Sequence, residues 1–468
     1  MKKTNVILVM CDDLGYGDTG FNGNTVIRTP HLDQLAREGA VFTRFHAGAP
    51  VCSPTRGTCL TGRHHYRYGI TTANDGKLPL EELTLATLLQ QNGYRTGHFG
   101  KWHLGTLSRE LKDGRRGGAT QPEWYSPPWQ HGFDTCFSTE VAIPLWNPME
   151  NQPFASKYWV QEGQYAEDNL EGDDSRVIMD RAIPFIEQCA AIDEPFLAVV
   201  WFHAPHTPVA AGPEHRAIYA DYSEGEQHYY GCVTAMDEQV GRLNDTLKRL
   251  SLEDDTLVWF CSDNGPEGPG GEGPGGEGRN RGSTGGLRGR KRSLFNGGTT
   301  VPTVLKWPKY VKPGTTYRSV GSTLDFLPTI LEEIGLSMPD ARPLDGVSLL
   351  PVLRGETERR SRPIVFRFVS NRDAMFGSPT FAVIDNEYKL LTNHTERLQD
   401  DMVFQLIEDP YESTNLIDSH PEFAERMRAY LKEQLDDYRR SHYGGDYANP
   451  DYKPLDPFIS NERAWNSD

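Results

Sequence analysis

The stretch Asn5-Val6-Ile7-Leu8-Val9-Met10 is a continuous apolar run that is rich in β-branched residues. This composition predicts a strand covered on both faces, as in the parallel sheets of α/β proteins. Residues 195–202 and 256–261 form two further runs of the same kind, and residues 229–250 between them carry apolar side chains at helical spacing. The strand–helix–strand order predicts an α/β fold, with a large doubly wound, mixed or parallel sheet flanked by helices.

The pattern changes after about residue 358. Short apolar segments follow one another at hairpin-like spacing, and a helical pattern follows over about 421–441. We expect a smaller C-terminal α+β domain, made of a short antiparallel sheet and one helix. The predicted domains are therefore 1–358, the large N-terminal α/β domain, and 359–468, the C-terminal subdomain.

Two segments of the first domain lack a regular period. Residues 106–174 are rich in Pro, Trp and Gly, which predicts an insertion that faces the substrate. Residues 265–286 contain Pro-Gly-Gly-Glu-Gly twice, which predicts a flexible glycine-rich loop. Its position directly after Asn264 would also suit a mobile lid.

The composition is that of a globular protein, with 37% hydrophobic and 24% charged residues and a formal net charge of −17. This acidic balance argues against nucleic-acid binding, and an anionic substrate needs a pocket that reverses the sign locally. No apolar run is long enough to span a membrane. The run at 6–10 is too short for a signal peptide, so we expect a soluble chain, cytoplasmic or, if a signal was removed, periplasmic or secreted.

Seven cysteines in so long a chain do not form a small disulfide scaffold. Residues 52–62 have the sequence Cys-Ser-Pro-Thr-Arg-Gly-Thr-Cys-Leu-Thr-Gly. Cys52 stands just before a proline-containing helix start, and a helix N-terminus stabilises negative charge. Arg56 lies one turn later on the same face. A nucleophile beside a cation suits an anionic substrate, whereas the plain alternative is a buried thiol at a helix start.

Polar residues follow two of the predicted strands. Asp12 and Asp13 come after the first strand, and Asp263 and Asn264 come after a later one. Carboxylate and amide oxygens are hard ligands that suit Ca²⁺ or Mg²⁺. Each pair alone could be a surface turn, but two pairs at the carboxyl ends of buried strands favour a metal site.

Residues 52–62 resemble the sulfatase signature Cys-x-Pro-Ser/Thr-Arg-x-x-x-Leu-Thr-Gly at every fixed position. Further motifs resemble the same family, type I formylglycine-dependent sulfatases of the alkaline phosphatase-like superfamily. They are Gly100-Lys-Trp-His-Leu-Gly105, Pro205-His-Thr-Pro208 and the Leu287–Gly298 segment around Lys291. Residues 405–416 resemble the structural tail of these enzymes. The resemblance extends from Asn5 to about Leu416.

This resemblance implies that a formylglycine-generating or maturase enzyme oxidises Cys52 to formylglycine. The hydrated aldehyde would attack sulfur in a sulfate monoester, and inorganic sulfate would leave afterwards. It also implies that Asp12, Asp13, Asp263, Asn264 and the oxygen at position 52 hold one divalent cation, usually calcium, with magnesium possible.

The resemblance assigns roles to the basic side chains as well. Lys101 would contact the formylglycine and the sulfate, and His103 would be the base that regenerates the aldehyde. His206 would bind sulfate and protonate the leaving alcohol, while Lys291 would hold the sulfate and the leaving oxygen. Arg56 would stabilise transition-state charge.

Three basic residues fall outside the matched positions. Arg290 and Arg292 flank Lys291, where they either form a solvated turn or contact further charges of the substrate. His203 is either a substrate contact or a structural histidine.

The sequence thus predicts a sulfatase. The aromatic residues of 106–174 favour a sulfated carbohydrate as substrate, because they offer stacking faces for sugar rings. They are Trp124, Tyr125, Trp129, Trp146, Tyr158 and Trp159. The alternatives are a phosphodiesterase or phosphonate monoester hydrolase of the same superfamily, an arylsulfatase with a non-sugar substrate, and a non-catalytic protein that binds sulfate esters.

Overall fold

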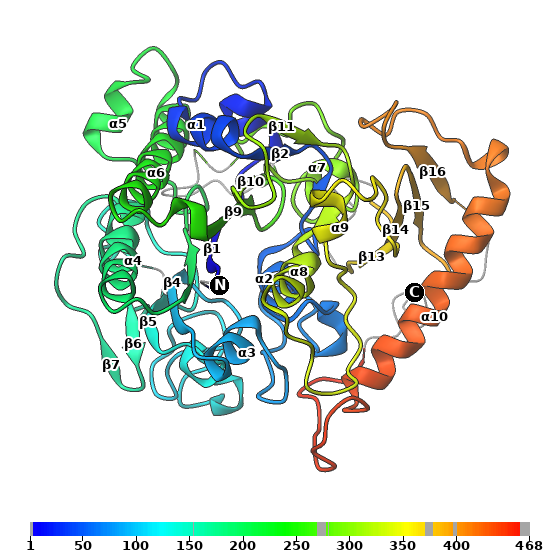
Figure 1. Ribbon diagram of the computed structural model, residues 1–468, viewed down its shortest axis with the longest axis horizontal. Helices are drawn as coiled ribbons and strands as arrows, with labels where there is room; N and C mark the ends of the chain where they lie inside the picture. The colour runs from blue at the N-terminus through cyan, green and yellow to red at the C-terminus, as the bar shows by residue number, and fades with distance from the viewer. Residues whose placement is uncertain are drawn as a thin grey trace.

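A ten-stranded mixed sheet forms the centre of the molecule (Figure 1), with the strand order β11-β2-β10-β9-β1-β8-β4-β5-β6-β7. The computed structural model describes residues 3–458 except 153, 269–277, 279, 370–377 and 396–399. The parallel centre consists of β9 (Thr256–Ser262), β1 (Asn5–Cys11), β8 (Phe196–Trp201), β4 (Arg95–Lys101) and β5 (Thr135–Thr139). The outer strands are β11 (Thr315–Tyr317), β2 (Ala40–Phe42), β10 (Val304–Lys306), β6 (Trp159–Gln161) and β7 (Gln164–Tyr165).

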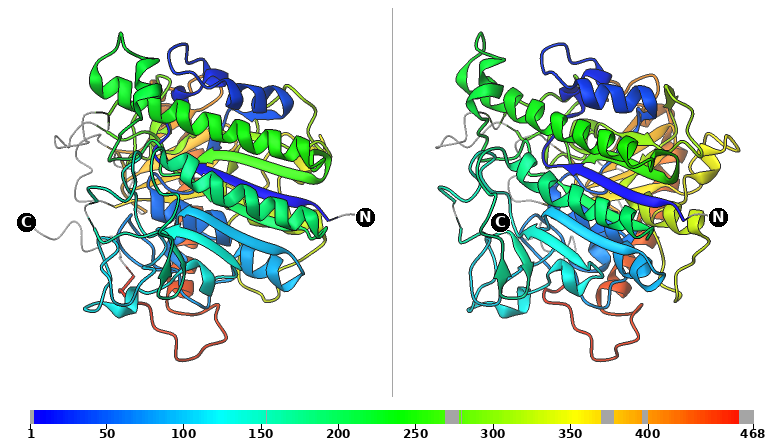
Figure 2. Two further views of the ribbon diagram at one scale, coloured as in Figure 1. Left: turned by 90° about the vertical axis from the view of Figure 1, so that its left-hand side faces the viewer. Right: turned by 60° about the vertical axis from the view of Figure 1, so that its left-hand side comes forward.

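Helices cover both faces of this sheet, which confirms the doubly wound prediction (Figure 2). Ile7 and Val9 of β1 pack with α1 (Pro30–Glu38), α4 (Asp174–Ala191) and α6 (Glu224–Arg249). Val6 and Leu8 point to the other face, towards α2 (Cys52–Thr61), α3 (Leu85–Gln91), α8 (Phe326–Ile334) and α9 (Leu350–Leu353). Because successive side chains of a strand alternate, one apolar run supplies both cores. The short elements are β3 (Phe45–His46), β12 (Gly321–Ser322), α5 (Pro213–Ala217) and α7 (Asn296–Thr299).

The C-terminal part contains a four-stranded antiparallel sheet and a long helix, as predicted. Its elements are β13 (Ile364–Arg367), β14 (Phe381–Asp385), β15 (Tyr388–Thr392), β16 (Met402–Gln405) and α10 (Pro421–His442). Val365 packs with α10, whereas Phe366 packs in a cluster with Leu294 and Cys52. The small sheet therefore closes over the start of α2. The boundary at 358/359 stays a prediction.

The interpretation of 106–174 as an insertion is wrong in part. Residues 135–139 form β5, a parallel neighbour of β4 inside the main sheet. The apolar pattern missed it because the strand ends in Ser138 and Thr139. The proposed stacking faces also need correction, since Tyr125 (4% exposed), Tyr158 (0%) and Trp159 (3%) are buried. Most of the glycine-rich loop, at 269–277 and 279, lies outside the described residues.

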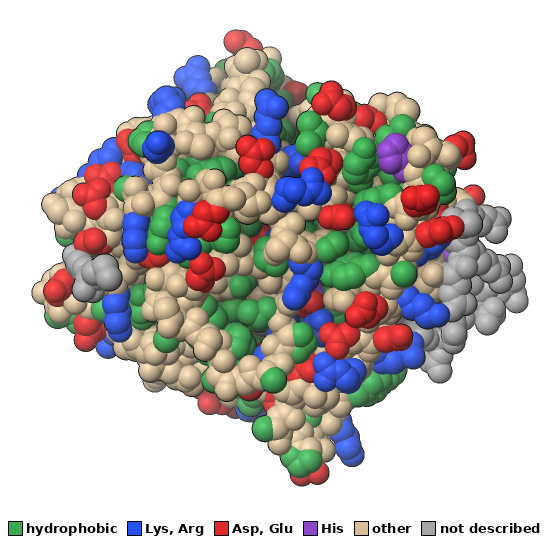
Figure 3. Space-filling model, turned by 45° about the vertical axis from the view of Figure 1, so that its right-hand side comes forward, with side chains coloured by type: hydrophobic (Ala, Val, Ile, Leu, Met, Phe, Trp, Pro, Cys, Tyr) green, Lys and Arg blue, Asp and Glu red, His purple; other side chains and the backbone are tan. Residues whose placement is uncertain are grey.

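Acidic and basic side chains are interspersed on the face shown in Figure 3, so the net charge of −17 does not gather there into one patch. Among the helices that the structure describes, none combines the length and the apolar character needed to span a bilayer.

Candidate active site

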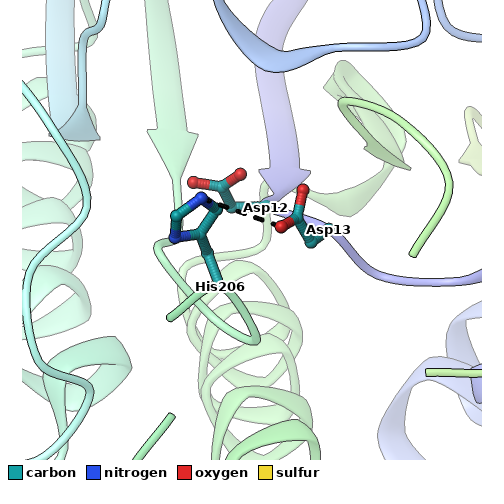
Figure 4. Close-up of side chains that lie close together, drawn as sticks. All are labelled: Asp12, Asp13 and His206. Carbon is teal, nitrogen blue, oxygen red and sulfur yellow. Dashed lines mark ion pairs between the residues drawn. The ribbon is translucent and has the colours of Figure 1, made fainter. Parts of the chain in front are cut away.

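The polar residues that follow β1 and β9 meet at one edge of the sheet. Cys11 is in register with Ser262, so Asp12 and Asp13 emerge beside Asp263 and Asn264. All four side chains are buried. Figure 4 shows the two aspartates at the carboxyl end of β1, with the ring of His206 turned towards them from the loop after β8. Adjacent parallel strands thus bring together residues that are about 250 positions apart in the chain.

Hydrogen bonds satisfy only part of this oxygen cluster. Asp13 N–H donates to Asp263 Oδ1 over 3.2 Å, and Asn264 Nδ2 donates to Asp13 Oδ1 over 2.7 Å. Asp12 Oδ1 and Asn264 Oδ1 are buried without a partner in the described part of the chain. Unsatisfied buried oxygens are costly, and a hard divalent cation is a ligand that would satisfy them. The donor set therefore fits calcium or magnesium.

The carboxyl groups of this cluster perturb one another. Burial and the neighbouring charge of Asp12 raise the pKa of Asp263 to about 7. Burial also opposes ionisation of Asp12, but the positive charges of Lys101, His206 and Arg56 hold its pKa well below the usual range. Such opposite shifts mark carboxylates that share one small volume.

Cys52 is the first residue of α2 and is buried beside this cluster. Its sulfur and carboxylate oxygens of Asp12 and Asp263 lie within 4.8 Å of one another. Burial raises the pKa of the Cys52 thiol, although Lys101 and Lys291 oppose that rise. The unmodified thiol is therefore protonated near neutral pH and is a weak nucleophile.

Two lysines reach the acidic cluster from separate elements. Lys101, at the end of β4, places Nζ 2.5 Å from Asp12 Oδ2. Lys291 places Nζ 2.5 Å from Asp13 Oδ1. Both are buried, and their positive charges act on Cys52 and offset the neighbouring carboxylates.

Arg56 lies behind the carboxylates rather than in the open part of the site. Its guanidinium is 2.7 Å from Asp263 Oδ2 and donates to the Lys101 carbonyl oxygen over 3.1 Å. It also stacks over Trp201, and its side chain is fully buried. This geometry favours a role in holding Asp263 and the end of β4 in place.

The two histidines with predicted proton-transfer roles are both close to the cluster. His206 Nε2 is 3.7 Å from Asp13 Oδ2, and burial lowers the pKa of His206 to about 4, against the pull of Asp12 and Asp13. His103 has φ +57, so the backbone leaves the extended conformation of β4 at this residue. Its Nδ1 is buried without a partner among the described residues, and burial lowers its pKa as well.

His203 is placed differently from His206. It is 0% exposed, and both ring nitrogens contact protein atoms, at 2.8 Å from Asp174 Oδ2 and 2.7 Å from Thr139 Oγ1. No nitrogen remains for a substrate, which favours the structural alternative. Because His206 N–H donates to the His203 carbonyl oxygen over 2.8 Å, His203 anchors the loop that carries His206.

The arginines that flank Lys291 are also engaged. Arg290 Nε donates to the Glu267 carbonyl oxygen over 2.8 Å, and Arg292 pairs with the Glu267 carboxylate. These contacts favour the structural alternative over additional contacts to substrate. The tail segment is structural too, since buried Glu412 is 2.8 Å from Lys389 and accepts from Asn296 N–H.

Sequence reasoning missed several residues around the site. Buried Arg116 and Glu140 form an ion pair of 2.9 Å behind His103, and Glu267 pairs with Arg292. Each is a single charged residue in a segment without periodicity, so no pattern could have found it.

A family model described as Sulfatase matches residues 4–336, and one described as N-sulphoglucosamine sulphohydrolase, C-terminal, matches residues 289–441. This chain belongs to the sulfatase family. The sulfatase is 31% identical over 450 residues to steryl-sulfatase of Mus musculus, covering 78% of this chain and 68% of that protein. It is 30% identical over 472 residues to arylsulfatase G of Rattus norvegicus, covering 91% and 85%. It is therefore a sulfuric ester hydrolase.

Solved structures share the fold of this sulfatase. Ps i-CgsB has a TM-score of 0.77 and 25% identity over 92% of this chain and 93% of that one. A phosphonate monoester hydrolase of Agrobacterium radiobacter has a TM-score of 0.61 and 20% identity, over 94% of this chain and 96% of that one, and shares the fold alone.

Proposed function

We propose that this sulfatase hydrolyses a sulfate monoester of a carbohydrate, using formylglycine at position 52 and a bound calcium ion, and releases inorganic sulfate. The observation that carries the proposal is the position of Cys52. Cys52 begins a helix and lies beside the oxygens of Asp12 and Asp263. The charges of Lys101 and Lys291 lower the pKa of its thiol against the effect of burial. A buried thiol of raised pKa is a poor nucleophile, so the proposed reaction needs the modified side chain in its place.

The cation would be held by Asp12, Asp13, Asp263, Asn264 and the side chain at position 52, where orphaned buried oxygens support the fit. When bound, the cation would polarise the sulfate as a Lewis acid, and the hydrated aldehyde at position 52 would offer a hydroxyl group as nucleophile. Magnesium has the same ligand preference but demands stricter octahedral geometry.

The lysines and histidines of the chain perform the remaining tasks. We assign Lys101 and Lys291 to binding the sulfate oxygens, because both ammonium groups are fixed beside position 52 by the aspartates. His206 would protonate the leaving alcohol, since an arriving anion raises a histidine pKa. His103 would act as base, and its unpartnered Nδ1 is free among the described residues to accept a proton.

The rim of the site supports a polar substrate. His206 and Arg292, which are 20% and 26% exposed beside the cluster, are both polar. N-acetylgalactosamine-6-sulfatase of Canis lupus familiaris is 31% identical over 389 residues, covering 77% of this chain and 68% of that protein, and its name specifies a sugar sulfate. Steryl-sulfatase is equally similar. A polar rim favours the sugar over a sterol, because burial of polar groups against an apolar ring is unfavourable.

The test of the modification is peptide mass spectrometry on protein produced together with a formylglycine-generating enzyme. We expect the peptide with Cys52 to carry an aldehyde in place of CH₂SH. Cys59, a buried thiol of the same helix, is the internal control and stays unmodified. An intact thiol at position 52 in active protein contradicts the proposal.

The test of the reaction compares an aryl sulfate with an aryl phosphate diester and with sulfated sugars. We expect the sulfated sugar to have the highest kcat/KM. Preference for the diester would instead support the phosphodiesterase alternative. Preference for the aryl sulfate over every sugar would support a non-sugar arylsulfatase. Binding without turnover by modified enzyme would support the non-catalytic alternative.

A further inference from the structure

The loop that contains Arg115 and Arg116 is fixed to the backbone of two other loops, at Gly76 and at His103. Arg116 is buried and its Nε is 2.9 Å from Glu140 Oε1. The same guanidinium donates to the His103 carbonyl oxygen over 3.2 Å and to the Gly76 carbonyl oxygen. Because these contacts use separate nitrogens of one planar group, they leave the backbone at 116 little freedom. The residue before it is therefore held in a defined place.

Arg115, unlike Arg116, is exposed. The side-chain amide of Asn74 is oriented so that its NH₂ group donates to the Ala73 carbonyl oxygen and its oxygen accepts from Arg115, each over 3.2 Å. The neighbouring Ala73 carbonyl oxygen accepts from Ser53 Oγ over 3.0 Å, and Ser53 directly follows Cys52. A short chain of contacts thus connects the Arg115 guanidinium to the first turn of α2, at the rim of the catalytic pocket.

The charge of Arg115 is not matched by the protein. Within the described residues, no carboxylate lies within ion-pair distance of it, and the acid next to Asn74, Asp75, accepts from Thr72 Oγ1 over 2.7 Å. Arg292 at the same rim differs, because Glu267 pairs with it. The rim therefore holds one arginine that the protein neutralises and another that it leaves open to solvent.

We propose that Arg115 forms a second anion subsite, which binds a sulfate or carboxylate of the substrate other than the sulfate ester that is hydrolysed. The inference rests on the proposed sulfatase function and narrows its substrate class to saccharides that carry at least two anionic groups. An arginine fork matches the oxygens of sulfate and carboxylate, so an anchored, unpaired arginine is suited to select such a group.

The experiment starts with wild-type enzyme that contains formylglycine. Its kcat/KM is measured on 4-methylumbelliferyl sulfate and on a panel of sulfated disaccharides with one or two anionic groups. We expect at least one doubly charged disaccharide to exceed its singly charged counterpart about tenfold, the effect of one charge-assisted hydrogen bond. If wild type prefers singly charged sugars, or hydrolyses only the aryl sulfate, the subsite is disproved while the sulfatase activity stands. If it hydrolyses none of them, the proposed function itself fails.

The decisive variants are Arg115→Gln and Arg115→Lys. We expect Arg115→Gln to lower the ratio of the two disaccharide kcat/KM values about tenfold, mainly through KM, and Arg115→Lys to retain part of the preference. Arg37→Gln, at an exposed arginine of α1, is the matched control and keeps the wild-type ratio. Since Arg115 is exposed, its variants keep the wild-type Tm. An unchanged ratio in Arg115→Gln would overturn the inference.

Discussion

Two buried clusters of charge in this sulfatase use the same residue types in opposite ways. Around Arg67, the guanidinium forms a bidentate pair with Asp345, with Nε 2.7 Å from Oδ2 and an outer nitrogen 2.8 Å from Oδ1, and it bonds Ser441 over 2.8 Å. In the catalytic cluster, Asp12 Oδ1 and Asn264 Oδ1 are buried without partners among the described residues. We call the Arg67 cluster closed, because Arg67 and Asp345 satisfy each other, and the catalytic cluster open, because two of its oxygens lack partners. The closed cluster stabilises the fold, whereas the open cluster can bind a ligand.

The contrast between these two clusters indicates which buried charges belong to an active site. A buried arginine pair is a poor marker of an active site, because the polar groups satisfy each other. Two orphaned oxygens within one cluster of carboxylates, those of Asp12 and Asn264, are a better marker, because one hard cation would satisfy both. Substitutions in the two clusters should therefore affect different properties, either turnover or stability.

The largest expected effect is on turnover, at position 52. Cys52→Ala removes the precursor of the nucleophile, so we expect kcat on an aryl sulfate to fall by at least about a thousandfold. Cys59→Ala is the control: it also deletes a buried thiol of α2, yet should retain the turnover of folded enzyme. Thermal unfolding checks that both variants are folded. Retention of a tenth or more of the activity by Cys52→Ala would contradict the assigned nucleophile.

Removing a carboxylate from the closed Arg67 cluster should lower the stability of the protein rather than its turnover. Asp345→Ala removes the bidentate partner of buried Arg67 and leaves only Asp437, which is 30% exposed, as its carboxylate at 2.7 Å, so we expect a loss of about 3 kcal/mol of unfolding free energy. Asp340→Ala breaks an ion pair whose carboxylate is 39% exposed, and should cost less than about 1 kcal/mol. Urea unfolding measures both, and an aryl sulfate assay at low temperature should show wild-type kcat for the folded fraction. Equal losses of stability would remove the distinction between the clusters.

Filling the open cluster should stabilise the protein. Calcium at about 100 times its Kd should add about 2.7 kcal/mol, because it binds the folded state alone. Asp263→Asn should abolish this response, whereas Asp18→Asn, at a buried acid outside the metal-binding group, should keep it. Melting curves with calcium and with chelator provide the measurement. A full calcium response in Asp263→Asn would place the ion elsewhere.

The smallest expected effect concerns pH at the buried His65, two residues before Arg67. Burial, with a further contribution from the charge of Arg367, lowers the pKa of His65 to about 3, below the value of about 6.5 for an unfolded chain. The neutral ring therefore contributes stability that is fully present above about pH 6.5 and is lost as the pH falls towards 3. Between pH 6.5 and 5.5 this loss approaches about 1 kcal/mol.

His65→Gln isolates that contribution, because glutamine does not titrate. Urea unfolding at the two pH values should show a smaller loss of stability in His65→Gln than in wild type. His65→Asn, a second replacement that does not titrate, is the control and should show the same smaller loss. If His65→Gln keeps the wild-type slope, His65 is not the group that titrates.

Local patterns predicted much of this molecule. The three apolar runs form β1, β8 and β9 as expected, and the helix at 421–441 corresponds to α10. Patterns failed where burial does not require apolar residues. Strand β5 ends in Ser138 and Thr139, and Tyr158 is buried by stacking on Phe137 rather than exposed for a sugar. The sequence alone does not show whether an aromatic residue lies on the surface or in the core.

Three central strands, the family motifs and the residues that meet at the strand ends could be predicted from the sequence, because they depend on local composition and on the direction of parallel strands. Which polar groups are satisfied depends on the folded arrangement. It engaged both nitrogens of His203, turned Arg56 behind the carboxylates, paired Arg292 with Glu267 and left Arg115 open. Partners of this kind come from distant segments, so no local pattern records them.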